Sequence, residues 1–169
     1  MKNKELVSII IRTKNEERWI NKCLKKIFEQ TYDNFEIIIV DNYSKDKTLE
    51  KARKFQIKKI IRLKEYLPGK ALNTGIRYSS GSFIVCISSH CIPKNKVWLK
   101  NLVSAINENE KFAAVYGRQE PMNFSNELDM RDLFLTFGLD RKIQKKDSFF
   151  HNANSIIRRK ILKEIKFDE

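Results

Sequence analysis

Short, continuous apolar runs that alternate with helix-like segments constrain this chain more than any other feature. Four runs rich in β-branched residues are typical of buried strands, at 6–12, 35–40, 58–63 and 83–87. They are apolar throughout rather than alternating, which indicates a sheet covered on both faces. Segments 16–30, 46–55 and 71–78 place apolar residues at helical spacing between them. The alternation predicts an α/β fold, with a mostly parallel central sheet flanked by helices.

The rest of the chain continues this pattern less regularly. An amphipathic helix is expected over 98–106 and a fifth strand over 112–116. Two more helices are expected over 128–137 and 158–165. No internal repeat or linker interrupts the sequence, so residues 1–169 are expected to form a single domain.

Length and composition exclude several classes of protein. With 169 residues the chain can bury a core without disulfides or metals. Its aromatic content of 11% is too high for a disordered tail, and it contains no run of 18 apolar residues. The charged N-terminus lacks the apolar core of a signal peptide. The three cysteines, Cys23, Cys86 and Cys91, cannot all pair within one chain, which favours free thiols in a reducing cytoplasm.

The net charge of +13 suits nucleic acid, an anionic membrane face or a phosphorylated ligand. The positive residues are spread along the whole chain. A genome biased toward Lys, Asn and Ile accounts for them equally well, so both interpretations stay open.

Ligands of open α/β sheets bind at the carboxyl ends of the strands. After the first strand, Thr13, Asn15 and Glu16 are polar, although capping of the next helix by Thr13 or Asn15 explains them equally well. Asp41 directly follows the second apolar run, too early to cap a helix. It is a candidate acceptor for a ribose hydroxyl or a base N–H.

Two later segments carry weaker signals. Gly69 opens a helix and Lys70 adds charge, a combination that favours phosphate, although the spacing is not that of a Walker loop. His90 and Cys91 follow the fourth run, but no second His/Cys pair lies near them in sequence. This argues against a structural zinc site, and an isolated His90 would be an ordinary loop residue.

Taken together, these segments resemble the nucleotide-binding half of an inverting family 2 glycosyltransferase with the GT-A fold. The resemblance covers residues 6–169 and is strongest over 6–48. The matching motifs are Asn15-Glu16, Cys23-Leu24, Gln30-Thr31-Tyr32, the run ending in Asp41, Ser44, Asp46, Thr48, Asn73-Thr74-Gly75 and Phe149 to Ser155.

The resemblance implies roles for individual residues. Residues 1–93 would form the nucleotide-binding half, and 94–169 the start of the acceptor half. Thr13, Asn15, Glu16 and Asp41 would line the base and ribose pocket. The remaining expected donor-binding residues are Ser44, Gly69, Lys70, Asn73, Ser88 and Ser89.

Two departures from the family pattern bear on mechanism. The D-x-D position, whose last carboxylate normally binds a metal, reads Ser88-Ser89-His90. A divalent cation, Mn²⁺ or Mg²⁺, would then depend on His90, or Lys and Arg would replace it. The carboxylate that deprotonates the acceptor hydroxyl is expected beyond Glu169, so the catalytic residue is unknown. The chain is therefore expected to be a GT-A domain truncated at its C-terminus.

The expected function is transfer of a sugar, with inversion, from a UDP- or dTDP-sugar to a glycan or lipid-linked acceptor. The stretch 117–121 resembles a bacterial subgroup that includes rhamnosyltransferase-like members. The expected location is cytoplasmic, with peripheral contact to the anionic inner membrane face. Two alternatives stay open: a basic nucleic-acid-binding protein, and a nucleotide-sugar-binding module without turnover.

Overall fold

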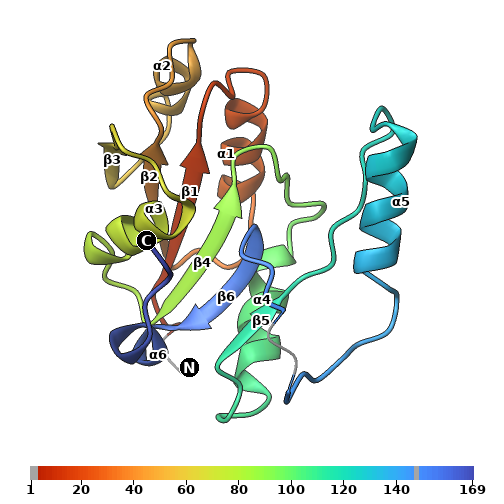
Figure 1. Ribbon diagram of the computed structural model, residues 1–169. Coiled ribbons are helices and arrows are strands. Elements are labelled where there is room, and N and C mark those ends of the chain that lie inside the picture. The colour runs from red at the N-terminus through yellow and green to blue at the C-terminus, as the bar shows by residue number, and fades with distance from the viewer. Residues whose placement is uncertain (1–3, 147–148) are drawn as a thin grey trace.

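Six strands form one sheet in the order β3-β2-β1-β4-β6-β5 (Figure 1). The structure is a computed structural model that describes residues 4–146 and 149–169. The strands are β1 (Val7–Thr13), β2 (Phe35–Asp41), β3 (Lys59–Arg62), β4 (Phe83–Ser88), β5 (Ala114–Tyr116) and β6 (Asn154–Arg158). The first four are parallel, whereas β6 runs antiparallel to both β4 and β5.

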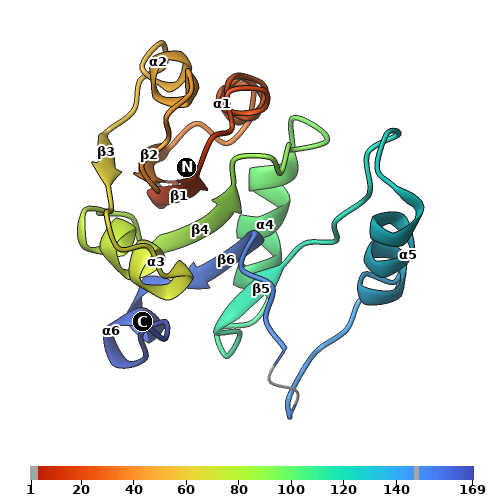
Figure 2. The same ribbon diagram turned by 45° about the horizontal axis from the view of Figure 1, so that its top comes forward.

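The helices are α1 (Ile20–Phe28), α2 (Thr48–Ala52), α3 (Pro68–Arg77), α4 (Trp98–Asn107), α5 (Glu127–Thr136) and α6 (Arg159–Glu164). All of them except α5 lie against one face or the other of the sheet (Figure 2). Side chains of α1, α2 and α4 pack into one hydrophobic cluster, and those of α3 and α6 pack into or against another on the opposite face. This arrangement confirms the predicted α/β architecture with a mostly parallel sheet.

Strand β1 lies at the centre of the sheet, and its register aligns the site. It pairs with β2 on one side and β4 on the other, and Ile9, Ile10 and Ile11 are fully buried. The pairing places Thr13 opposite Asp41, and Arg12 opposite Ser88. Polar residues from three distant segments therefore meet at one edge of the sheet.

The sequence pattern missed one strand. No strand was predicted over Asn154–Arg158, where the structure has β6. This strand lies between β4 and β5 in the sheet, so β5 pairs with β6 and not with β4. Several element boundaries also differ, the starts of two helices among them. Helix α1 begins at Ile20 rather than at residue 16, and α3 begins at Pro68, whose fixed φ suits a first helical turn.

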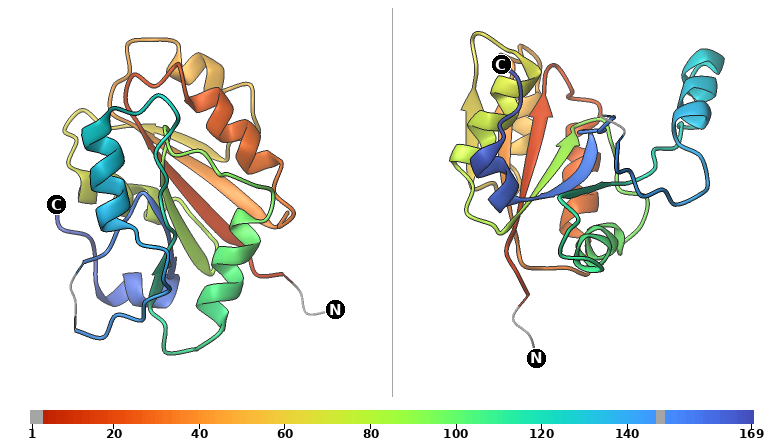
Figure 3. Two further views of the ribbon diagram at one scale, coloured as in Figure 1. Left: turned by 90° about the vertical axis from the view of Figure 1, so that its right-hand side faces the viewer. Right: turned by 60° about the horizontal axis from the view of Figure 1, so that its bottom comes forward.

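Helix α5 stands apart from the sheet, and none of its residues is buried (Figure 3). The segment from 121 to 146 leaves the body of the molecule and returns to it. Of the helices in the described ranges, none is both long and apolar enough to cross a membrane.

Gly81 precedes β4 where the backbone of the strand-β1 segment passes closely. A Cβ at this position would lie 2.5 Å from the Leu6 carbonyl oxygen and 2.7 Å from the Ser8 nitrogen. Since backbone atoms cannot move aside cheaply, we expect Gly81→Ala to lower the free energy of unfolding by about 1–3 kcal/mol. Gly138 has no atom within 4 Å of its added Cβ, so Gly138→Ala is the matched control. Urea denaturation of both variants measures the difference, and equal midpoints would contradict the prediction.

Candidate functional site

Backbone N–H groups of the loop after β1 donate to side chains of the loop after β2. The N–H of Asn15 donates to Ser44 Oγ at 2.9 Å, and that of Glu16 to Thr48 Oγ1 at 2.7 Å. In return, Asn15 Oδ1 accepts from the N–H of Lys45 at 2.9 Å. Asn15 has a φ of 51°, in the left-handed region that Asn tolerates better than most residues. We call these two joined segments, 13–17 and 41–48, the paired loops.

The prediction that Thr13 or Asn15 caps the first helix is wrong. The residue that precedes α1 is Trp19, and no side chain accepts a hydrogen bond as its cap. Thr13 and Asn15 lie a full turn or more before that helix. Asn15 and Ser44 instead hold the two loops at the sheet edge in fixed positions.

Asp41 is fully buried at the end of β2. Its carboxylate accepts from the N–H of Ser44 at 3.0 Å and from the Ser44 hydroxyl at 2.5 Å. Arg62 Nε approaches the same carboxylate at 3.3 Å, while its guanidinium lies 4.3 Å from the centre of the Tyr43 ring. The Arg62 side chain is 45% exposed, so its long contact with Asp41 is the one that a ligand can replace most easily.

Thr13 lies opposite Asp41 in the strand register. It is buried, and its hydroxyl has no hydrogen-bond partner. Buried polar atoms in folded proteins are nearly always paired, so an unpaired hydroxyl at a strand end marks a place where a ligand group can complete the bonding.

The segment after β4 brings a histidine against the paired loops. His90 Nδ1 lies 2.8 Å from Glu16 Oε1. The contact with Cys91 and the hydrogen bond with Glu16 together outweigh burial and raise the pKa of His90 to about 9. A pair of this kind is an ion pair at neutral pH, with Nε2 as the ring nitrogen not engaged by Glu16.

These residues supply few ligands for a metal. Ser88 and Ser89 offer only hydroxyls, and Glu16 already bonds to His90. Within residues 4–146 and 149–169, no three His, Cys, Asp or Glu side chains cluster at metal-binding distance. One nitrogen, Nε2 of His90, is available after loss of its proton, with Glu16 orienting the ring as carboxylates do behind metal-bound histidines. A divalent cation would therefore take most of its ligands from a bound diphosphate.

The amino end of α3 contacts the C-terminal segment of the chain. Asn73 Nδ2 donates to the Phe167 carbonyl at 2.8 Å, and Asn73 Oδ1 accepts from the Phe167 N–H at 3.1 Å. The carbonyl of Asp168 lies against Gly69, where a Cβ would clash with it. Lys70 reaches Glu65 at 3.4 Å. In this structure Gly69 and Asn73 thus hold the C-terminal segment.

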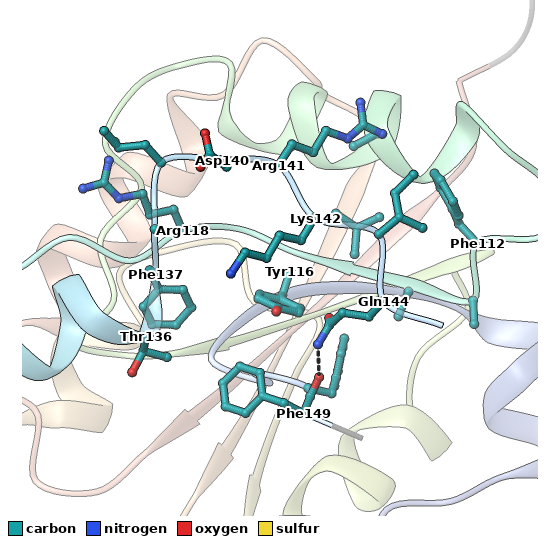
Figure 4. Close-up of a pocket in the computed structure, with 18 of the residues that line it drawn as sticks. Phe112, Tyr116, Arg118, Thr136, Phe137, Asp140, Arg141, Lys142, Gln144 and Phe149 are labelled. Atoms are coloured by element: carbon teal, nitrogen blue, oxygen red, sulfur yellow. Dashed lines mark hydrogen bonds between the residues drawn. The ribbon is translucent and has the colours of Figure 1, made fainter. Parts of the chain in front are cut away.

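Sequence reasoning missed two features of this region. One is Arg12, which lies between Val40 and Ser88 in the register. The other is a cavity of about 590 Å³ between β5 and residues 136–144 and 149–150 (Figure 4). The ring of Tyr116 meets the edges of Phe149 and Phe150 there, with centroids at 5.8 and 6.0 Å. Its cationic lining residues are Lys111, Arg118, Arg141 and Lys142. The only sequence signal for it was the aromatic pair near position 150.

Comparison with known proteins yields one family and several relatives. Residues 8–166 match the family model described as glycosyl transferase family 2. The chain is 37% identical over 123 residues to a dolichyl N-acetyl-alpha-D-glucosaminyl phosphate 3-beta-D-2,3-diacetamido-2,3-dideoxy-beta-D-glucuronosyltransferase of Methanococcus voltae, covering 66% of this chain and 38% of the relative. It is 33% identical over 125 residues to a UDP-Glc:alpha-D-GlcNAc-diphosphoundecaprenol beta-1,3-glucosyltransferase of Escherichia coli, covering 70% of this chain and 47% of the relative. The chain spans less than half the length of these curated relatives.

Solved structures share the fold at low sequence identity. A mannosyltransferase from Pyrobaculum calidifontis, in complex with GDP-Man and Mn²⁺, superposes with a TM-score of 0.73 at 20% identity, over 96% of this chain and 47% of that chain. Residues 1–349 of S. aureus TarS, in complex with UDP-GlcNAc, give a TM-score of 0.64 at 24% identity, over 94% and 46%. These matches confirm the predicted GT-A fold.

The paired loops give rise to a pH-dependent prediction through Asp46. Burial raises the pKa of Asp46, but hydrogen bonds from the Thr48 hydroxyl and from the Glu17 and Thr48 N–H groups outweigh it and lower the pKa overall. A carboxylate whose pKa is lower in the folded state stabilises the fold above its unfolded pKa, and this stabilisation is lost as the pH falls through the folded pKa. We therefore expect Asp46→Asn to melt at a lower temperature than the wild type at neutral pH, and the gap to shrink in acid.

Thermal melts of both proteins from pH 7 to pH 3 measure this gap. Asp33, whose pKa is also lowered but which lies outside the paired loops, provides the control variant Asp33→Asn. A gap for Asp46→Asn that does not change with pH would contradict the assignment.

Proposed function

The chain belongs to glycosyl transferase family 2, and on that premise we propose that it binds the nucleotide-sugar donor of an inverting sugar transfer. The observation that carries the proposal is the alignment of Thr13 with Asp41 at the carboxyl ends of adjacent parallel strands. One presents a buried hydroxyl without a partner, and the other a buried carboxylate. A nucleoside offers the complementary groups, namely ribose hydroxyls and a base N–H.

The paired loops support this role because they hold both groups in place before any ligand binds. We assign mainly a positioning role to Asn15, Glu16 and Ser44, because each of them already forms hydrogen bonds within the paired loops. Asp41 binds the nucleoside when Arg62 moves from the carboxylate. Preorganised groups of this kind lower the cost of binding.

For the whole protein we propose transfer to a glycan or lipid-linked acceptor. The names of two relatives support this acceptor class: the relative from Methanococcus voltae is named for a dolichyl phosphate sugar, and the one from Escherichia coli for a diphosphoundecaprenol sugar. The reaction is a single displacement: the acceptor oxygen bonds to the anomeric carbon as the bond from that carbon to the diphosphate oxygen breaks, the nucleoside diphosphate leaves, and a carboxylate takes the proton of the acceptor hydroxyl. We do not assign the role of this carboxylate to Asp168 or Glu169.

A divalent cation fits this proposal through one protein ligand. When bound, it would polarise the diphosphate oxygens and stabilise the leaving group. His90 Nε2 would hold it, and Glu16 would orient the imidazole. The chain's own part is to fix the position of the His90 ring.

Donor binding tests the proposed function directly. We expect thermal melts with millimolar UDP, dTDP or GDP, each with Mn²⁺ or EDTA, to show a rise of about 5–10 °C for one nucleotide near a hundred times its Kd. Asp41→Asn keeps the size of the side chain and should weaken that nucleotide about tenfold or more, since it removes one charge-assisted hydrogen bond. Asp33→Asn, which changes an exposed carboxylate, is the matched control.

Two results would contradict the proposal. One is the absence of a response to every nucleotide. The other is equal affinity of Asp41→Asn and the wild type in a variant whose own melt shows that it is folded.

Peripheral attachment to an anionic bilayer is the second part of the proposal. Around α5, large apolar side chains are exposed: Leu128 by 66%, Leu135 by 77%, Leu139 by 84% and Ile143 by 61%. Basic residues share this segment, at Arg131, Arg141, Lys142, Lys145 and Lys146. Apolar and basic groups together suit an interface with anionic headgroups. A lipid-linked acceptor would also be found there.

Vesicle sedimentation measures this attachment. We expect binding to vesicles containing phosphatidylglycerol, weaker binding to phosphatidylcholine alone, and loss at high salt because screening removes the electrostatic part. Leu135→Glu with Leu139→Glu should weaken binding about tenfold, since two apolar side chains no longer enter the interface. Ile165→Glu changes an equally exposed residue outside the segment and serves as control. The proposal would be overturned if vesicle binding were the same with and without anionic lipid and the same for the double variant as for the wild type.

A further inference from the structure

Arg12 is a partly buried cation that forms no ion pair with the residues that the structure describes. Its Nη2 donates to Asn152 Oδ1 at 2.9 Å, and its Nε is buried with no partner. In the described part of the chain, no carboxylate lies within ion-pair distance of it, whereas Arg62, for example, pairs with Asp41. A guanidinium removed from water without a compensating charge carries a desolvation cost, which an anionic ligand would offset.

Other unpaired polar atoms lie on the chain segments next to Arg12. Among the described residues, Nε of Arg12 and the hydroxyls of Thr13 and Ser89 are buried and have no hydrogen-bond partner. They come from the end of β1 and from the residue that follows β4, its neighbour in the sheet. Since unpaired buried groups are rare in folded proteins, their presence at the carboxyl ends of two adjacent strands indicates a place for a ligand.

The chemistry of these groups selects an anion. A guanidinium only donates hydrogen bonds, and its planar fork matches two oxygens of a phosphate. The Ser89 hydroxyl can donate a further bond, and the Ser89 N–H already bonds to the Arg12 carbonyl, which fixes the two residues together. Burial and the positive charge of Arg12 lower the pKa of His151, which favours the neutral imidazole beside the guanidinium.

Arg12 also lies beside the segment that departs from the family pattern. Its register partner is Ser88, the first residue of Ser88-Ser89-His90. Carboxylates at these positions would form ion pairs with the guanidinium. Two serines and a histidine leave it unpaired.

We propose that Arg12, together with Ser89, forms a metal-independent oxyanion site that binds the diphosphate of the donor. The inference rests on the proposed function and names a residue for it that the sequence pattern did not indicate. Asn152 is a positioning residue, since it holds the guanidinium through Nη2. A cation at His90 would add to this site rather than create it.

Inorganic pyrophosphate tests the site without a nucleobase. Melting temperatures are measured in EDTA at fixed ionic strength, with and without pyrophosphate. We expect the wild type to rise in a concentration-dependent way and Arg12→Met to lose the response, with pyrophosphate binding roughly tenfold to a hundredfold weaker. Arg12→Lys should keep part of the response because it keeps the charge. Arg131→Met removes an equal charge from the exposed face of α5 and should respond like the wild type.

A structural role for Arg12 makes the opposite prediction for the ligand-free protein. If Arg12 serves an anion, Arg12→Met melts at the same temperature as the wild type or higher, because it removes an unpaired buried charge. If Arg12 only stabilises the fold, Arg12→Met melts at a lower temperature than the wild type and still responds to pyrophosphate. That result overturns the inference. Should Arg12→Met not fold, Arg12→Gln gives the same comparison. No response in the wild type, or equal loss in Arg131→Met, also overturns it.

UDP, dTDP and GDP separate this inference from the proposed function. If one nucleotide binds through Asp41 while Arg12→Met binds it as tightly as the wild type in EDTA, the oxyanion site is wrong and the donor site stands. If pyrophosphate binding depends on Arg12 but no nucleotide binds, the oxyanion site stands and the proposed function fails.

Discussion

The position of β1 between two parallel neighbours is the constraint on which the rest of the structure depends. Its isoleucines are buried on both faces, so the strand cannot slip by one residue without exchanging the two hydrophobic clusters. That register fixes where the chain emerges from the sheet. It places Arg12 beside Ser88 and Thr13 beside Asp41. The polar edge is therefore a consequence of apolar packing several residues away.

Much of this arrangement was predictable from sequence because buried parallel strands leave a strong signal. The four apolar runs and the helices between them were found, and Asp41 was identified by its place directly after a run. Strand β6 was missed because its run, Asn154–Arg158, is short, is flanked by polar residues and pairs antiparallel with a strand about seventy residues earlier. Local periodicity carries no information about such a partner.

The site was predicted less completely than the fold, for a related reason. The sequence indicates which residues lie at strand ends but not which of them bond to one another. Asn15 and Ser44 looked like separate loop residues, yet they connect two loops. Arg12 looked like the ordinary polar end of a strand. Its importance depends on the absence of a carboxylate around it among residues 4–146 and 149–169, and that absence becomes visible only when β4 and β6 are in place.

Two kinds of positive charge on the protein would act differently on the donor that we propose. The net charge of +13 is spread along the chain and is screened by salt, so it would attract an anion without fixing its position. Arg12 is partly buried and bonded to Asn152, so its interaction with a phosphate would be short-ranged and directional. A metal held through one histidine would depend on the ligand to complete its coordination. A fixed guanidinium has no such requirement, and this is the physical reason for assigning the proposed phosphate contact to Arg12.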